Sequence, residues 1–214
     1  MDRLLDLYIK DNSTDELELL KELDRKTNLL TVQPRMISGH VQGLVLKMFV
    51  SMLKPKRVLE IGTFTGYSAI CLASGLETGA ELHTIDINDE ISYIAEEAFG
   101  KSDFSEKIFQ HIGSALDVVP RLGGVFELVF MDGDKREYMK YYDMLFEGGY
   151  VTKGSIIIAD NVLWDGKVID KSPKNLKDTY TRGILEFNEF VKNDSRVEVV
   201  ILPMRDGMSI IRVL

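Results

Sequence analysis

Two short segments with oxygen-bearing side chains each follow an apolar run of the chain. The segment MDGDKREY carries Asp132 and Lys135, and the segment ADNVLWDG carries Asp160 and Asn161. Carboxylate and amide oxygens are ligands of hard cations such as Mg²⁺, which takes about six oxygens and usually keeps open positions. If the apolar runs are neighbouring strands, Asp132, Asp160 and Asn161 predict a divalent-metal site on one rim of a sheet.

Each of these residues also has a simpler interpretation. Asp-Asn and Asp-Gly pairs are ordinary turn formers, and a lysine such as Lys135 is most often only solvated. The conjunction of two carboxylates, an amide and a lysine after neighbouring strands favours a catalytic centre instead. The open metal positions would then accept two vicinal substrate oxygens.

A third segment, VLEIGTFTGYSAI, predicts a buried strand, a turn with Gly62 and Gly66, and the start of a helix. Glycine permits positive φ and a close approach of ligand to backbone. The Gly-x-x-x-Gly spacing matches neither the dinucleotide fingerprint nor the phosphate-binding loop. Asp86 follows Gly62 at about the interval at which an acid reaches a ribose hydroxyl. Glu60, a carboxylate in an apolar strand, requires a partner. A nucleoside cofactor and a purely structural turn both remain open at this point.

The elements that position these segments are strands alternating with helices. Apolar runs predict strands at 57–61, 81–87, 107–113, 127–131 and 155–159, and helix-length segments lie between them at 65–76, 89–100, 114–122 and 135–147. Such alternation indicates a mainly parallel sheet covered by helices on both faces. After a helix near 179–192, runs at 197–202 and 209–214 are joined by a link too short for a crossover, so these two strands should be antiparallel.

Two helices are predicted before the first strand. Ser13 and Glu16 form a plausible capping box for a helix that continues to about residue 26. A second helix follows Pro34, because apolar residues recur at helical spacing on one face, and Pro55 ends it. The residues of that face are Val41, Leu44, Val45, Met48, Phe49 and Met52.

Composition limits the class of protein. The 214 residues are 45% hydrophobic and 28% charged, which suits one globular domain, and the net charge of −8 disfavours nucleic-acid binding. The single cysteine, Cys71, cannot form an internal disulfide. We saw no secretion signal and no stretch approaching 18 apolar residues, which predicts a cytoplasmic protein that does not span a membrane.

The motifs VLEIGTFTGYSA and HTIDIN resemble those of class I S-adenosylmethionine-dependent methyltransferases, and more narrowly the metal-dependent O-methyltransferases that include caffeoyl-CoA and catechol O-methyltransferases. The resemblance extends from Met36 to the C-terminus. It implies a Rossmann-like, doubly wound, seven-stranded α/β fold, mostly parallel with an antiparallel last strand. We expect one domain, with residues 1–37 as a helical extension and 38–214 as the catalytic core.

The resemblance also implies which residues bind the cofactor S-adenosylmethionine. Positions that match cofactor contacts of the family, with a looser match at the first two and at Asp134 and Tyr141, are Met36, Ser38, Glu60, Gly62, Ser68, Asp86, Ala115, Asp132, Asp134 and Tyr141.

The two oxygen-rich segments resemble the family motifs Asp-x-x-Lys-x-x-Tyr and Asp-Asn-x-Leu-Trp. Asp132, Asp160 and Asn161 match its three metal ligands, which implies Mg²⁺ with Ca²⁺ or Mn²⁺ as alternatives, and Lys135 matches its proposed general base. A bound cation would lower the pKa of a catechol hydroxyl and direct the oxyanion toward the methyl group.

The acceptor should lie near a polar segment at 164–178, because functional loops sit on the rim of rigid sheets. Trp164 and Asp165 are candidates for lining the acceptor site, although Trp164 could equally be core packing. Arg205 is more simply a turn charge. The three histidines, His40, His83 and His111, have no ligand spacing and are interpreted as structural.

The sequence therefore predicts methylation of a catechol-like small molecule, by an enzyme that the family resemblance suggests is a homodimer. The runner-up is a tRNA hydroxyuridine O-methyltransferase, to which the basic run Lys167, Lys171, Lys174 and Lys177 would contribute. A non-catalytic nucleoside-binding protein and a nicotinamide dehydrogenase are further alternatives, disfavoured by the intact metal–lysine set and by the glycine spacing.

Overall fold

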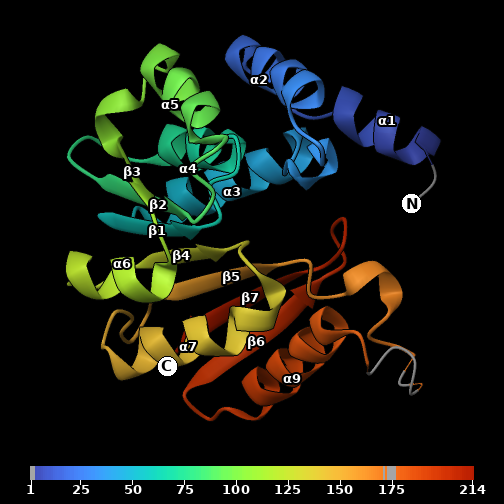
Figure 1. Ribbon diagram of the computed structural model, residues 1–214, viewed down its shortest axis with the longest axis vertical. Coiled ribbons are helices and arrows are strands. Elements are labelled where there is room, and N and C mark those ends of the chain that lie inside the picture. Colours follow the sequence, from blue (N-terminus) through green and yellow to red (C-terminus); the bar gives the residue numbers. More distant parts are fainter. Residues whose placement is uncertain (1–2, 171, 173–176) are drawn as a thin grey trace. The chain divides into compact units, whose positions relative to one another are not determined.

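The computed structural model describes residues 3–170, 172 and 177–214 (Figure 1). It divides into two compact units. Unit 1 comprises Met1–Lys56, Thr63–Thr84 and Asn88–Ile112, and unit 2 comprises Arg57–Gly62, Ile85–Ile87 and Gly113–Leu214. The expectation of one domain with an extension over residues 1–37 stays a prediction.

The seven strands form one sheet in the order β3-β2-β1-β4-β5-β7-β6. β1 pairs with β4 and β4 with β5 in parallel, whereas β7 is antiparallel to both β5 and β6. This confirms the predicted Rossmann-like α/β fold with an antiparallel last strand. The strands are β1 (Arg57–Ile61), β2 (Glu81–Asp86), β3 (Ile108–Ile112), β4 (Leu128–Met131), β5 (Ile156–Asp160), β6 (Val197–Leu202) and β7 (Met208–Val213).

The helices alternate with the strands as the sequence predicts. Unit 1 holds α1 (Arg3–Asp11), α2 (Glu18–Leu30), η1 (Pro34–Met36), α3 (His40–Leu53), α4 (Tyr67–Gly75), α5 (Ser92–Lys101) and η2 (Ser105–Lys107). Unit 2 holds α6 (Ala115–Leu122), η3 (Lys135–Glu137), α7 (Tyr138–Glu147), η4 (Trp164–Gly166) and α9 (Thr179–Asn193).

The predicted capping box near the N-terminus is wrong. Ser13 Oγ donates to the carbonyl of Ile9 at 2.7 Å and so closes the end of α1, and the cap of α2 is Leu17. Glu16 accepts a hydrogen bond from the Tyr67 hydroxyl. A buried tyrosine thus takes the carboxylate that the local motif would have used.

The buried side of α3 is not the face of large apolar residues that the periodicity indicates. Its buried residues are Gln42, Gly43, Leu46 and Val50, whereas Met48 and Met52 are 60% and 69% exposed. Glycine decides the contact, because a Cβ at Gly43 would lie 2.5 Å from Cys71 Sγ of α4. Small residues let two helix backbones approach closely.

The segment Pro34–Leu53 differs from expectation in a second way. By length and composition alone it is apolar enough to cross a membrane, with a mean hydropathy of 1.3 over an 18-residue window. A Cβ at Gly75 of α4 would lie 2.6 Å from the carbonyl of Lys47. The segment therefore packs closely against α4 on one side, and 28% of the 18-residue window is buried.

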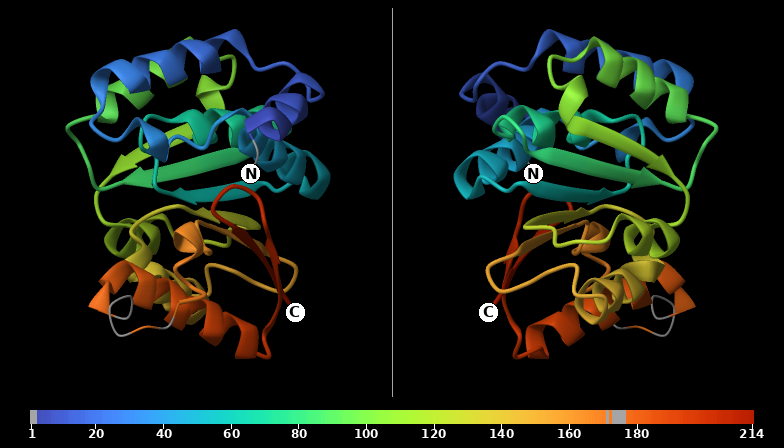
Figure 2. Two further views of the ribbon diagram at one scale, coloured as in Figure 1. Left: turned by 90° about the vertical axis from the view of Figure 1, so that its right-hand side faces the viewer. Right: turned by 90° about the vertical axis from the view of Figure 1, so that its left-hand side faces the viewer.

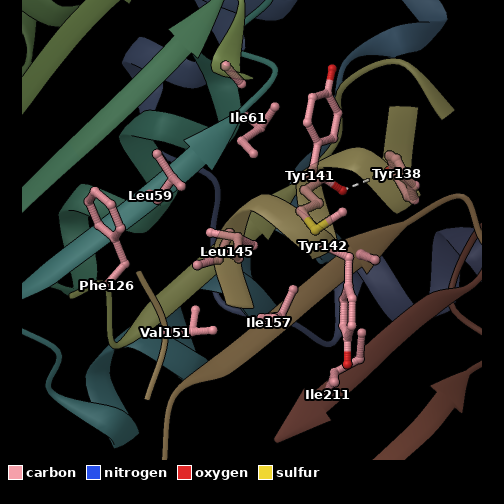
Figure 3. Close-up of a cluster of buried hydrophobic side chains, with 14 of the residues drawn as sticks. Leu59, Ile61, Phe126, Tyr138, Tyr141, Tyr142, Leu145, Val151, Ile157 and Ile211 are labelled. Carbon is pink, nitrogen blue, oxygen red and sulfur yellow. Dashed lines mark hydrogen bonds between the residues drawn. The ribbon is translucent and has the colours of Figure 1, made fainter. Parts of the chain in front are cut away.

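The core of unit 2 lies between its strands and the helices α6, α7 and α9, which cover one face of those strands (Figures 1 and 2). β4 and β5 are buried along their whole length, as apolar runs in a covered parallel sheet should be. Figure 3 shows α7 contributing three aromatic rings, Tyr138, Tyr141 and Tyr142, which pack among side chains of β1 and β5.

Candidate active site

Two carboxylates lie at the carboxyl ends of adjacent parallel strands in unit 2. Met131 of β4 pairs with Ala159 of β5, so Asp132 and Asp160 follow at the next register position of each strand. The Asp132 N–H donates to the carbonyl of Ile61 at 2.8 Å, which ties the end of β4 to β1. Asp160 is 5% exposed and the side chain of Asp132 is 18% exposed. The sheet thus brings together two carboxylates that are 28 residues apart in the chain.

Lys135 is buried beside this pair. Its Nζ donates to Asp132 Oδ1 at 2.6 Å and to the Tyr138 hydroxyl at 2.8 Å, and only 7% of its side chain is exposed. The Tyr138 hydroxyl lies 2.8 Å from the carbonyl oxygen of Met131 and 2.9 Å from that of Asp160. Tyr138 therefore joins the ends of β4 and β5 and fixes the position of the ammonium group.

The electrostatics of the pair follow from burial. Burial raises the pKa of Asp132 to about 6, although the ion pair with Lys135 opposes the rise, and the charge of Asp160 adds to it. Burial also raises the pKa of Tyr138 well above its usual value, so its hydroxyl keeps its proton and remains a donor. The charges of Lys135 and Arg205 both favour the ionised form of Asp132, the form that could bind a cation.

The segment after β5 is strained and held in place by the β6–β7 hairpin. Three non-glycine residues have left-handed backbone: Asn161 (φ 56°), Trp164 (φ 48°) and Asp165 (φ 52°). Such residues cluster at functional sites, where surrounding contacts hold them. Here Leu163 N–H donates to the Asp206 carbonyl at 2.9 Å and Asp165 N–H to Asp206 Oδ1 at 2.6 Å.

The donor set fits a hard divalent cation. Asp160 is a buried carboxylate and Asp132 a partly buried one on adjacent strand ends, and Asn161 follows directly with an amide oxygen. No three His, Cys, Asp or Glu side chains converge anywhere in 3–170, 172 and 177–214, so a third ligand would have to be of another type, such as the Asn161 amide. All-oxygen ligands suit Mg²⁺, Ca²⁺ or Mn²⁺.

The predicted nucleoside contacts in unit 2 lie at the ends of β1 and β2 and at the start of α6. Glu60 is fully buried in β1, and Gly62 follows with φ 108°. A Cβ at Gly62 would lie 2.6 Å from the Asp132 carbonyl oxygen, so close backbone packing alone requires this glycine. The Asp86 carbonyl accepts from the Gly113 N–H at 2.8 Å, just before Ala115 begins α6.

The remaining predicted cofactor residues differ in exposure and in hydrogen-bond partners. In unit 1, Ser38 and Ser68 are buried whereas Met36 is 54% exposed. In unit 2, Asp134 accepts hydrogen bonds from Arg136, and the Tyr141 hydroxyl donates to Glu137 at 2.8 Å. The Asp134 carboxylate and the Tyr141 hydroxyl thus already have partners within the protein. Their role in binding a cofactor stays a prediction.

Two of the histidines contact each other. His83 Nδ1 lies 3.0 Å from His111 Nε2, and His83 Nε2 lies 3.2 Å from Glu81 Oε1. Burial, with a contribution from His83, lowers the pKa of His111. This hydrogen-bonded arrangement agrees with a structural role. Of the basic run, Lys167 lies 3.6 Å from Asp178, and Lys171 and Lys174 lie outside the described residues.

Sequence reasoning assigned no role to three residues that shape the site. Tyr138 was signalled by the Asp-x-x-Lys-x-x-Tyr spacing, but its link between two strand ends needs the sheet register. Gly183 of α9 gave no signal, yet a Cβ there would lie 2.8 Å from the Lys135 carbonyl. Asp206 looked like an ordinary turn residue, and it holds the segment after β5.

Comparison with known proteins identifies the class. The O-methyltransferase family model matches residues 10–214. The chain is 32% identical over 179 residues to caffeoyl-CoA O-methyltransferase 1 of Eucalyptus globulus, which covers 80% of this chain and 72% of that protein. Two solved structures each have a TM-score of 0.89 at 26% identity. They are the O-methyltransferase of Bacillus cereus in complex with SAH (99% of this chain, 97% of that one) and the O-methyltransferase TomG of Streptomyces achromogenes in complex with SAM (100% and 99%).

A Rossmann-like fold with a site at the carboxyl ends of its strands, together with these matches, defines a class I methyltransferase. The chain belongs to the O-methyltransferase family. This confirms the expectation of an S-adenosylmethionine-dependent O-methyltransferase of the caffeoyl-CoA type.

Proposed function

We propose that this enzyme methylates one hydroxyl of a catechol-like or other vicinal-diol small molecule and depends on a divalent metal. The observation that carries the proposal is the buried Asp132–Lys135–Tyr138 network beside Asp160 at the ends of β4 and β5. A buried lysine beside one buried and one partly buried carboxylate is costly to fold. Their retention beside a strained loop favours a catalytic role over two ordinary turns.

The proposed ligands of the metal are Asp132, Asp160 and Asn161. When bound, S-adenosylmethionine supplies the methyl group, and the divalent cation lowers the pKa of the acceptor hydroxyl. The transfer breaks the sulfur–methyl bond and forms the oxygen–methyl bond. In this proposal Lys135 first loses one ammonium proton to solvent and then, as a neutral amine, receives the proton of the acceptor hydroxyl, while the Tyr138 hydroxyl holds its nitrogen in place.

The proposed cofactor contacts of unit 2 are Glu60, Gly62, Asp86, Ala115, Asp132, Asp134 and Tyr141. Carboxylates suit the amino and ribose hydroxyl groups of the cofactor, and the first turn of α6 offers N–H groups. The proposal retains Met36, Ser38 and Ser68 of unit 1 as further contacts. Trp164 and Asp165 would line the acceptor site, since they follow the metal segment on the strained loop.

The test compares wild type, Lys135→Met and Lys140→Met with a vicinal diphenol and the matching monophenol as acceptors. Met keeps the length of lysine without its amine, and Lys140 is an exposed lysine of α7 that pairs with Glu137 at 3.3 Å. We expect methylation of the diphenol alone, with kcat reduced about 10²- to 10⁴-fold in Lys135→Met and unchanged in Lys140→Met. Equal rates for both phenols, or a fully active Lys135→Met, would contradict the proposal.

A further inference from the structure

Four side chains of unit 2 form a continuous series of ring and cation contacts. Arg136 Cζ of η3 lies 4.6 Å from the centroid of the Tyr180 ring in α9. The Tyr180 and Trp164 rings are stacked, with centroids 5.7 Å apart and planes within 13°. Lys167 Nζ lies 5.7 Å from the centroid of Trp164. We call these four residues the aromatic series.

Each cation of the aromatic series is also held by a carboxylate. Arg136 Nε donates to both oxygens of Asp134, at 2.9 and 3.0 Å. Lys167 Nζ lies 3.6 Å from Asp178 Oδ2, and Asp178 also accepts from the Tyr180 N–H at 3.2 Å as the cap of α9. The Lys167 end is therefore tied to the start of α9, which carries Tyr180, and the Arg136 end is tied to the cap of η3.

The ring at the centre of the series is on the strained segment. Trp164 has φ 48° and the next residue, Asp165, has φ 52°, a backbone region that bulky residues rarely adopt. The hairpin contact from Asp165 N–H to Asp206 fixes the backbone on one side of the indole. The indole ring itself packs against the core of unit 2 and contacts Lys167 and Tyr180, and Tyr180 is 16 residues further along the chain.

Tyr180 connects the Trp164 stack to the candidate active site through its helix. Its helix, α9, packs against η3 through Gly183, where a Cβ would lie 2.8 Å from the carbonyl of Lys135. The same helix therefore contacts the backbone of the lysine and the ring of Trp164. A fixed distance between Lys135 and an acceptor wall is what a methyl transfer that relies on alignment requires.

We propose that Tyr180 is a positioning residue, which with Arg136 holds the Trp164 indole in place as a wall of the acceptor site before the acceptor binds. The inference rests on the proposed function, in which Trp164 lines that site. Tyr180 touches no reacting atom and acts through Trp164. Its loss should weaken acceptor binding while leaving cofactor binding intact.

The chain offers a direct reporter, because Trp164 is its only tryptophan. Intrinsic fluorescence therefore reads the environment of this one ring, with no need for an active enzyme. The variants are Tyr180→Ala, Tyr180→Phe and, as a matched control, Tyr93→Ala. Tyr93 is a half-exposed tyrosine of α5 that also lies beside a lysine, Lys26, at 5.9 Å.

We expect Tyr180→Ala to shift the emission to the red and to raise the acceptor KM about 2- to 10-fold, the range that one aromatic pair implies. The KM for S-adenosylmethionine should not change, and Tyr180→Phe and Tyr93→Ala should behave as wild type. Arg136→Gln, which leaves the rings stacked, should shift emission and KM in the same direction by less. Arg136→Gln replaces Tyr180→Ala in the test if Tyr180→Ala does not fold.

Three results would overturn the inference. Unchanged emission in Tyr180→Ala would show that the rings are not stacked in solution. A shifted emission with an unchanged acceptor KM would show that the stack does not position the acceptor wall, although the proposed function would stand. A lower kcat together with an equal rise in the KM for the acceptor and the KM for S-adenosylmethionine would show that Tyr180 has a merely structural role. If wild type methylates no vicinal diphenol, the proposed function fails, and unchanged emission on adding the diphenol would then reject the acceptor wall as well.

Discussion

At the scale of single residues, the candidate site depends on two carboxylates and a lysine that are mostly removed from water. Asp132 and Asp160 lie on adjacent strand ends with one buried lysine between them and the protein core. Burial raises the pKa of Asp132 above its ordinary value because the carboxylate loses water that Lys135 replaces only in part. A carboxyl group with a raised pKa should bind a metal more tightly as pH rises, whereas without metal it should stabilise the folded state less as pH rises.

The pH dependence of metal binding tests this residue. The folded pKa of Asp132, about 6, is above its unfolded value of 3.8, so without metal this group favours the folded state at low pH and loses that contribution as pH rises through 6. A cation binds the deprotonated carboxylate, so Mg²⁺ affinity should rise with pH and fall about tenfold per unit below 6. Calorimetric titration between pH 5 and 7.5 measures it.

A matched variant removes this titration. Asp132→Asn keeps the shape of the side chain without the ionisable group, so its residual Mg²⁺ binding should vary much less over the same pH range. The same steep profile in Asp132→Asn would show that another group controls the affinity.

At the scale of elements, the strands were predictable because buried parallel strands are short apolar runs bounded by turn residues. β1 and β6 match their predicted ranges, and the other strands differ only at their ends. The helix α3 was located, but its buried side was not, because the contact through Gly43 depends on which helix lies opposite. The stack of Trp164 on Tyr180 and the contact of Gly183 likewise depend on α9 lying against η3, which no local pattern shows.

Gly183→Ala tests how α9 positions the lysine. The new Cβ would lie 2.8 Å from the carbonyl of Lys135 and 3.2 Å from Cα of Arg136, which is backbone that cannot move without shifting η3. We expect a loss of about 1–3 kcal/mol in the free energy of unfolding and a reduced kcat. Gly100→Ala is the control, because nothing lies within 4 Å of its Cβ in α5. That substitution should stabilise by about 0.5–1 kcal/mol. Equal stabilisation by both would show that η3 and α9 are not in close contact.

At the scale of the whole molecule, the net charge of −8 and the oxygen-rich site favour a small neutral or cationic diol over a nucleic acid. The family follows from the sequence alone, since its motifs lie in the strand-to-helix turns that the fold requires. The identity of the metal and of the acceptor does not follow from the sequence. The motifs specify the metal ligands and a base, but they do not specify what fills the remaining positions around the metal. Those two features are therefore the centre of the proposed function.

Methyl transfer with and without a chelator tests metal-assisted chemistry most directly. Wild type, Asp160→Asn and Glu198→Gln, an exposed carboxylate of β6 paired with Arg212, are incubated with radiolabelled methyl donor and a vicinal diphenol, and in parallel with bulk tRNA. We predict that chelator lowers the wild-type rate by at least about 10²-fold and that excess Mg²⁺ restores it. Asp160→Asn should stay inactive with Mg²⁺, and Glu198→Gln should match wild type. Undiminished transfer to the diphenol in chelator, or labelling of tRNA alone, would contradict the proposed function.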